Sequence, residues 1–95
     1  MSVQSIFQAL ADSTRRKILK LLKKGKMSAG EICSNFDITA AAISRHLTIL
    51  KDANLIIDER EGKYIYYTLN ISVLEEISLW ISDFMDIEGD GKNEK

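Results

Sequence analysis

The chain has 95 residues, of which 45% are hydrophobic and 28% are charged, which suits one small globular domain and is too short for two. No apolar stretch reaches the roughly 20 residues that a membrane-spanning helix needs, so we expect no membrane insertion. No basic segment precedes an apolar one near the N-terminus, so we expect no secretory signal. The single cysteine, Cys33, cannot form an internal disulfide, which is typical of a cytoplasmic protein.

Charges are distributed unevenly along the chain. Residues 1–51 contain nine Lys or Arg and three Asp or Glu, whereas residues 52–95 contain four and eleven, so the net charge of −1 conceals a basic half and an acidic half. This asymmetry is typical of a protein that meets a polyanion with one face. The charge pattern alone fits equally well a basic helix that is simply solvated.

The first two predicted helices cover residues 3–10 and 13–24. Apolar residues in the first recur at helical spacing, as do those of the second. Asp12 is the predicted N-cap of the second helix, since its carboxylate can accept a free backbone amide. Gly25 is a predicted stop, because glycine adopts the left-handed conformation that ends many helices.

Two further helices are predicted over 28–36 and 39–53. Ser28 and Glu31 fit a capping box, in which each side chain bonds to the backbone amide of the other residue. Thr39 follows closely and can cap the next helix. A short helix joined by a tight turn to a second helix is the helix-turn-helix unit.

The C-terminal half is predicted to contain a hairpin over 55–69 and a long helix over 72–87. Strand-like segments flank a turn at Glu61-Gly62-Lys63, and the apolar residues of the long helix return to helical spacing. We predict one domain over 1–87, mainly α with a small β-hairpin (α+β), with the architecture of a winged helix-turn-helix. The charged, glycine-containing tail 88–95 is predicted to be disordered.

The helix over 39–53 is the candidate for reading DNA. On a helical wheel, Ile43 lies near Leu47 and Leu50, which predicts the face that packs on the core. The opposite face has no acid before Asp52, and a major groove admits such a helix. An ordinary amphipathic helix with a solvated polar face is the alternative interpretation. The polar face comprises Ala41, Ser44, Arg45 and Thr48, with Lys51 at its edge.

Two cations flank the hairpin turn and make it a candidate wing. Arg60 and Lys63 can reach backbone phosphates or an adjacent minor groove. They fit equally a charged strand edge that prevents aggregation, and Glu61 between them weakens the DNA interpretation.

Three segments together resemble the ArsR-type winged-helix repressors of bacteria, and most closely the SdpR-like autorepressor branch of that family. They are Leu10-Ala11-Asp12-Ser13-Thr14-Arg15-Arg16-Lys17-Ile18-Leu19, Ile43-Ser44-Arg45-His46-Leu47-Thr48-Ile49-Leu50-Lys51 and Gly62-Lys63-Tyr64-Ile65-Tyr66-Tyr67-Thr68-Leu69. The similarity extends over residues 3–87. Ser13 stands where family members usually have proline, which removes a rigid first helical residue and leaves the Asp12 cap intact.

The resemblance implies a homodimer that binds a double-stranded DNA operator and blocks transcription. The wheel leaves His46 as either a DNA contact or a packing residue, and its place in the family's serine-x-histidine block favours DNA. The expected DNA contacts are Ser28, Thr39, Ala40, Ala41, Ser44, Arg45, His46, Thr48, Lys51, Arg60 and Lys63.

The family builds its dimer interface from the first and last helices, which correspond here to 3–10 and 72–87. The last helix also has more apolar surface than a short monomer easily covers, although both helices could simply complete the core of a monomer. The expected interface residues are Val3, Ile6, Phe7, Leu74, Ile77, Trp80, Ile81 and Phe84.

The sequence departs from the metal-sensing members of the family. Cys33-Ser34-Asn35 keeps one thiol of the family's Cys-x-Cys pair, and residues 71–88 lack the histidines of the last-helix site. Because a soft divalent ion needs several Cys or His ligands, we expect no bound metal and no cofactor. Any inducer is then a separate molecule, such as a partner protein or a small molecule.

The sequence therefore predicts a metal-independent dimeric repressor with an approximately palindromic operator. The alternative is a winged-helix module that binds another protein and not DNA. That alternative predicts exposed apolar residues where Ser44, Arg45 and Thr48 stand. An enzyme is not expected, because the sequence has no acid–base pair, phosphate-binding loop or nucleophile motif.

Overall fold

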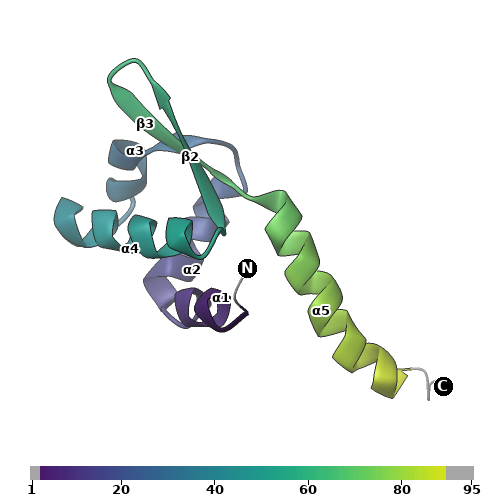
Figure 1. Cartoon of the computed structure of the whole chain (residues 1–95). Helices are drawn as coiled ribbons and strands as arrows, with labels where there is room; N and C mark the ends of the chain where they lie inside the picture. Colours follow the sequence, from purple (N-terminus) through teal and green to yellow (C-terminus); the bar gives the residue numbers. More distant parts are fainter. Residues whose placement is uncertain (1–2, 90–95) are drawn as a thin grey trace.

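The computed structural model describes residues 3–89, which form five helices and a three-stranded antiparallel sheet. Helices α1 to α4 pack into one body beneath the β2–β3 hairpin, and α5 leaves that body at an angle (Figure 1). This arrangement confirms a mainly α fold with a hairpin. The elements are α1 (Val3–Leu10), α2 (Ser13–Leu22), β1 (Met27–Ser28), α3 (Ala29–Cys33), α4 (Ala40–Asp52), β2 (Ile56–Glu61), β3 (Tyr64–Leu69) and α5 (Ile71–Gly89).

Side-chain caps fix the starts of the three middle helices. Asp12, Ser28 and Thr39 each accept a hydrogen bond, 3.1 Å long, from the backbone amide three residues further along. The Glu31 carboxylate in turn accepts a hydrogen bond of 2.8 Å from the Ser28 backbone amide, which completes the predicted capping box. Each cap satisfies an amide that has no partner within its helix and typically stabilises the helix by about 1 kcal/mol.

Three helices are shorter than the sequence predicts, and α4 differs by one residue at each end because Thr39 and Ala53 are its caps. Helix α2 ends at Leu22 rather than at residue 24, and α3 ends at Cys33 rather than at residue 36. After the last residue of α2 and of α3, backbone amides donate to the carbonyl three residues back instead of four. One example is the hydrogen bond of 3.1 Å from Phe36 N to Cys33 O. These tighter bonds turn the chain instead of continuing the α-helix.

Helix α5 begins at Ile71, one residue before the predicted start, and its cap is Asn70. The Asn70 side-chain oxygen accepts from the Val73 amide at 3.4 Å, so Ser72 lies inside the helix. The helix continues to Gly89 and so includes two residues of the predicted tail. The rest of that tail, 90–95, lies outside the described residues.

The sheet contains a short strand that the sequence pattern does not reveal. Strand β1 pairs with β3, with Met27 opposite Tyr67, so the order across the sheet is β1–β3–β2. The β2–β3 hairpin closes with Glu61 opposite Tyr64, and Gly62 in the turn has a φ of 65°. That backbone conformation is readily available to glycine, which explains the tight reversal.

The core lies between the four N-terminal helices and the base of the hairpin, and α5 contributes Val73 and Ile77 to it. As the wheel predicts, α4 packs on it through Ile43, Leu47 and Leu50, each at most 2% exposed. Burying each of these side chains contributes on the order of 1.5–3 kcal/mol, so the opposite face of α4 is held outward. The largest fully buried side chains are Ile6, Ile18, Ile32, Ile43, Leu50 and Leu55.

Candidate nucleic-acid interface

Helix α4, the helix predicted to read DNA (the reading helix), presents an exposed polar face beside the hairpin. Thr39, Ala41, Ser44, Arg45 and Thr48 are all exposed, as predicted. The first turn has no acidic residue and the last turn contains Lys51. The positive end of the helix dipole and this absence of acid favour the approach of an anion.

The exposed side chains differ in how much bonding capacity they retain. The Thr48 hydroxyl donates to Ser44 O at 3.0 Å and keeps its acceptor lone pairs. Thr39 uses its hydroxyl oxygen for the helix cap. Arg45 has no hydrogen bond or ion pair to any residue within 3–89, so all five donors of its guanidinium are available.

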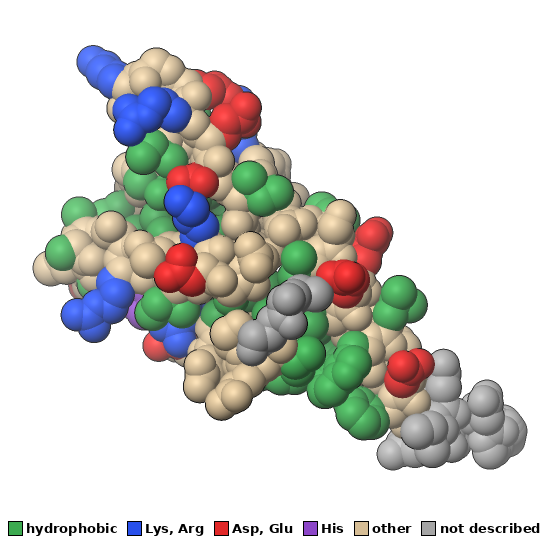
Figure 2. Space-filling model, in the orientation of Figure 1, with side chains coloured by type: hydrophobic (Ala, Val, Ile, Leu, Met, Phe, Trp, Pro, Cys, Tyr) green, Lys and Arg blue, Asp and Glu red, His purple; other side chains and the backbone are tan. Residues whose placement is uncertain are grey.

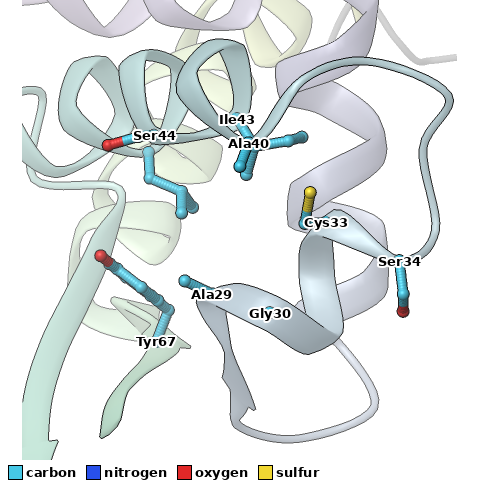
Figure 3. A pocket seen from close by; sticks show the side chains of 9 residues that line it. Ala29, Gly30, Cys33, Ser34, Ala40, Ile43, Ser44 and Tyr67 are labelled. Atoms are coloured by element: carbon cyan, nitrogen blue, oxygen red, sulfur yellow. The ribbon is translucent and has the colours of Figure 1, made fainter.

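A hollow of about 400 Å³ separates the start of the reading helix from α3 and β3 (Figure 3). Small residues at its edge allow another backbone to approach closely, and the Tyr67 ring forms one wall. Burial raises the pKa of the Tyr67 phenol. Ala29 and Gly30 of α3 come close to α4 only in the folded chain, so the sequence pattern does not mark them as part of a site. The lining residues are Ala29, Gly30, Cys33, Ser34, Ala40, Ile43, Ser44, Leu47 and Tyr67.

The His46 ring lies at the corner between α1 and α2 and also lines a small hollow with Thr39, Ala41 and Arg45 of the exposed face. Its side chain is 18% exposed. The ring atom Nδ1 lies 3.2 Å from Nη1 of Arg15 and 3.9 Å from Oδ2 of Asp12. This position fits the packing alternative, and the DNA contact that the resemblance favours stays a prediction.

Lys51 lies at the end of the reading helix and joins it to the hairpin. Its ammonium forms an ion pair of 2.9 Å with Asp58 on β2, and this hydrogen bond raises the pKa of Lys51. The cation therefore positions the hairpin in the free protein. A phosphate contact by Lys51 requires competition with the Asp58 carboxylate.

The hairpin tip carries cations, as Figure 2 shows. Arg60 and Lys63 are both exposed, and Lys63 lies 5.8 Å from the centroid of the Tyr64 ring. One further cation, Lys26, lies at the hairpin because β1 pairs with β3, and the sequence pattern alone does not reveal this position. Lys26 forms an ion pair of 2.6 Å with Glu61, which raises the pKa of the lysine. This ion pair offsets the negative charge of Glu61, which lies between Arg60 and Lys63 in the sequence.

Ser28 lies at the start of α3, near the hollow. Its hydroxyl oxygen accepts from the Glu31 amide, which leaves the hydroxyl hydrogen free to donate. Ser28 and Ala40 are the two remaining residues of the set that is predicted to contact DNA. Apart from His46, the members of that set lie on the exposed side of α4, at the start of α3 or on the hairpin.

A second surface, apolar, runs along α5 and is visible in Figure 2. Of the expected interface residues, Trp80, Ile81 and Phe84 are 39%, 40% and 55% exposed. Val3 and Leu74 are half-buried. Leu79 and Met85, which the sequence analysis omits, are 69% and 63% exposed on the same helix.

Two of the expected interface residues instead belong to the core of the single chain. Ile6 is fully buried and Ile77 is 7% exposed, so neither offers surface to a second copy. Helical spacing identifies both as apolar positions and does not distinguish a core contact from a subunit contact. Phe7, next to Ile6, is 39% exposed and therefore offers surface to a second copy.

Helices α3 and α4 with their tight turn, followed by the β2–β3 hairpin, define a winged helix-turn-helix protein. Residues 12–58 match the family described as "Bacterial regulatory protein, arsR family". The transcriptional repressor SdpR of Bacillus subtilis is 48% identical over 84 residues, which cover 88% of this chain and 93% of that repressor. The chain therefore belongs to the ArsR family of bacterial regulatory proteins.

Other relatives and solved structures agree with this assignment. The arsenical resistance operon repressor of Escherichia coli is 33% identical over 82 residues, which cover 85% of this chain and 67% of that repressor. The crystal structure of the ArsR family transcriptional regulator RHA00566 superposes with a TM-score of 0.82 at 26% identity, over 90% of this chain and 88% of that one. The function class is DNA-binding transcriptional repression, and the prediction that the chain is not an enzyme is confirmed.

No helix within residues 3–89 is both long enough and apolar enough to span a membrane.

Proposed function

We propose that the chain is a dimeric repressor that reads a palindromic operator with α4 and supports that contact with the hairpin wing. The observation that carries the proposal is the exposed, acid-free face of α4, at whose centre Arg45 forms no hydrogen bond or ion pair with residues 3–89. Arg can bond to guanine O6 and N7 as a fork, while Ser44 and Thr48 can bond to base edges or phosphates. The exposed alanines Ala40 and Ala41 let the helix enter a groove closely.

The wing and the start of α3 contribute contacts to the DNA backbone in this proposal. Arg60 and Lys63 extend from the hairpin tip, where they can neutralise phosphates or enter a minor groove. Ser28 can donate its hydroxyl hydrogen to a phosphate oxygen. Such contacts supply affinity without sequence preference, so discrimination falls to the reading helix.

Dimerisation is proposed through α5 together with α1. The exposed Trp80, Ile81 and Phe84 form an apolar face that a second copy would remove from water, with Phe7 alongside. A large exposed apolar patch is typical of a protein interface. A symmetric pair of reading helices would meet two half-sites about one helical turn, or a multiple of it, apart.

The repressor is proposed to act without a metal ion, because the donor set does not fit one. Tetrahedral sites for soft ions use Cys and His ligands, and the whole chain has one of each. Cys33 lines the hollow beside α3, whereas the His46 ring faces the α1–α2 corner. Release from DNA is proposed to depend on a separate inducer, either a protein or a small molecule.

A titration of randomised duplex DNA at two salt concentrations tests the proposal. We expect binding at low salt that weakens steeply as salt rises, because lysine and arginine release counterions from the phosphates. The matched pair of variants is Arg60→Ala with Lys63→Ala against Lys17→Ala with Lys20→Ala, which remove equal charge from the wing and from α2. We expect the wing pair to lose more affinity. A failure to bind any duplex at low salt would favour the protein-binding alternative.

A further inference from the structure

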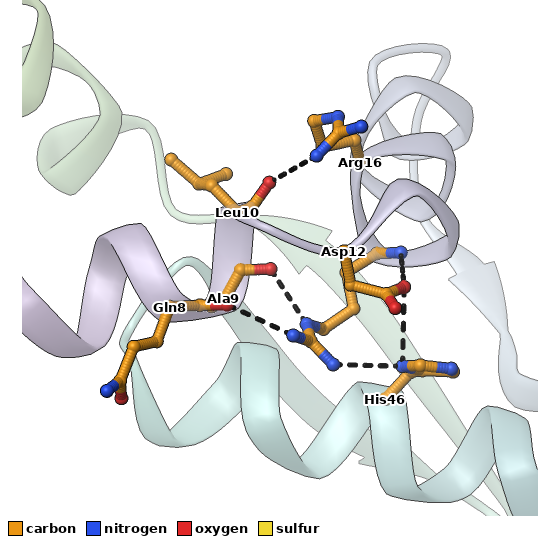
Figure 4. A network of polar contacts seen from close by, with 7 residues as sticks. Gln8, Ala9, Leu10, Asp12, Arg16 and His46 are labelled. Carbon is orange, nitrogen blue, oxygen red and sulfur yellow. Dashed lines mark hydrogen bonds and ion pairs between the residues drawn. The ribbon is translucent and has the colours of Figure 1, made fainter.

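The C-terminal end of α1 is held by two guanidinium groups from α2 (Figure 4). Arg15 donates from Nε to Ala9 O at 2.7 Å and from Nη2 to Gln8 O at 3.0 Å, while Arg16 donates from Nη1 to Leu10 O at 2.7 Å. The last carbonyls of a helix have no partner inside it, and α1 has no basic residue of its own in its last turn. The two arginines therefore supply a cap that the sequence of α1 lacks.

The same Arg15 guanidinium also bonds to the reading helix. Its Nη1 lies 3.2 Å from Nδ1 of His46. Since a guanidinium only donates, Nδ1 must accept, and the proton of the neutral ring must be on Nε2. One side chain thus connects the end of α1 to the middle of α4.

Protonation of the His46 ring at Nδ1 would break this hydrogen bond. A proton on Nδ1 would face the donor Nη1, and the bond from Arg15 would be lost. The Asp12 carboxylate, 3.9 Å from Nδ1, would become the partner of the ring instead. Within residues 3–89, Arg45 lines the same small hollow on α4 as the ring, and α1 contributes no charged residue.

We propose that Arg15 is a positioning residue for DNA binding: acting through the unprotonated ring of His46, it fixes the reading helix against the end of α1. The inference rests on the proposed function, in which α1 lies beside the subunit contact and α4 enters the groove. Two copies can meet successive half-sites only if each reading helix is held at a set angle to the dimer axis. Loosening the link therefore costs more affinity for the two-half-site operator than for random duplex DNA.

The pH profile of DNA binding tests the link, because a proton on Nδ1 removes the acceptor that Arg15 uses. For a duplex selected by the wild-type chain, we expect the affinity to be at least about fivefold lower at a pH where ¹⁵N signals show the ring protonated than at a pH where they show it neutral, within the range of typical coupling between sites. His46→Asn offers an oxygen acceptor near the position of Nδ1 and cannot take up this proton, so its affinity should not differ between those two pH values. An unchanged or higher wild-type affinity with the ring protonated would overturn the proposal, since a protonated ring on the DNA would strengthen binding.

Two arginine variants form the matched control. Arg15→Ala and Arg16→Ala remove the same charge and each removes contacts with the end of α1, but only Arg15 bonds to His46. We expect the pH dependence to disappear in Arg15→Ala and to persist in Arg16→Ala. A pH dependence that persists in both would overturn the link.

One readout needs neither a variant nor DNA. His46 is the single histidine of the chain, so its ¹⁵N signals can be assigned without ambiguity. We expect the neutral ring to carry its proton on Nε2, and a proton on Nδ1 would overturn the proposed bond. A wild-type chain that binds no duplex at neutral pH would overturn the proposed function, while the ring signals would still decide the link.

Discussion

The ring centroids of Phe7 and Trp80 lie 5.5 Å apart, so the first and last helices meet through two aromatic side chains from opposite ends of the chain. Trp80 also contacts Phe84 edge-on, with centroids 4.9 Å apart. Each of these three rings remains more than a third exposed. The cluster therefore completes the contact between α1 and α5 and still offers an aromatic surface to a second copy.

Replacement of Trp80 and Phe84 by serine is expected to produce monomers. Burying each aromatic side chain contributes on the order of 1.5–3 kcal/mol, so loss of two per subunit should weaken dimerisation by at least about a hundredfold. Sedimentation at micromolar concentration measures the change. Ile57→Ser is the control, because Ile57 is 49% exposed on β2 and lies outside the α1–α5 cluster. A dimer that persists in the double variant would refute the interface.

Arg45→Ala is expected to cost about 1–3 kcal/mol of binding energy on the specific duplex, if the guanidinium reads a base. Binding isotherms on the selected duplex and on a scrambled one measure this difference. Lys20→Ala, on the exposed side of α2, removes equal charge and should weaken both duplexes to the same small extent. An equal loss on both duplexes for Arg45→Ala would assign it to a phosphate instead.

Asp12→Ala is expected to destabilise the fold by about 1 kcal/mol at neutral pH, because α2 loses its N-cap. The backbone amide of Arg15 lowers the pKa of Asp12. The carboxylate therefore contributes its stabilisation above the ordinary pKa of aspartate and loses it as the pH falls through the lowered value. Denaturant titrations should show the gap between wild type and variant closing below about pH 4. Asp12→Asn retains a good cap and should lose less stability at neutral pH.

Addition of zinc or of a chelator is expected to leave the DNA affinity unchanged. One cysteine and one histidine cannot complete the ligand shell that a soft divalent ion needs. Fluorescence anisotropy on the selected duplex measures the affinity with and without each additive. A shift of about tenfold, typical of coupling between two sites, would show that a metal site exists.

The sequence predicts most of the fold because its signals are local. The caps at Asp12, Ser28 and Thr39 all depend on residues within one turn. The apolar spacing of α4 likewise determines which of its faces is buried.

The features that the sequence misses depend on contacts between distant segments. Strand β1 is two residues long and exists because Met27 pairs with Tyr67, and periodicity has no signal at that length. The wheel gives the angle of His46 on α4 and cannot show that Arg15 reaches it from α2. In the same way, helical spacing marks Ile6 as apolar without showing that the chain's own core already covers it.

Selection of bound duplexes from a random pool tests the central claim most directly. The account predicts enrichment of an inverted repeat whose half-sites are centred about 10–10.5 base pairs apart, or a multiple of that distance. It also predicts that Arg45→Ala relaxes the preference at one position in each half-site. Recovery of no preferred sequence, or of a single unrepeated site bound by one chain, would contradict the claim that a symmetric pair of α4 helices reads the operator.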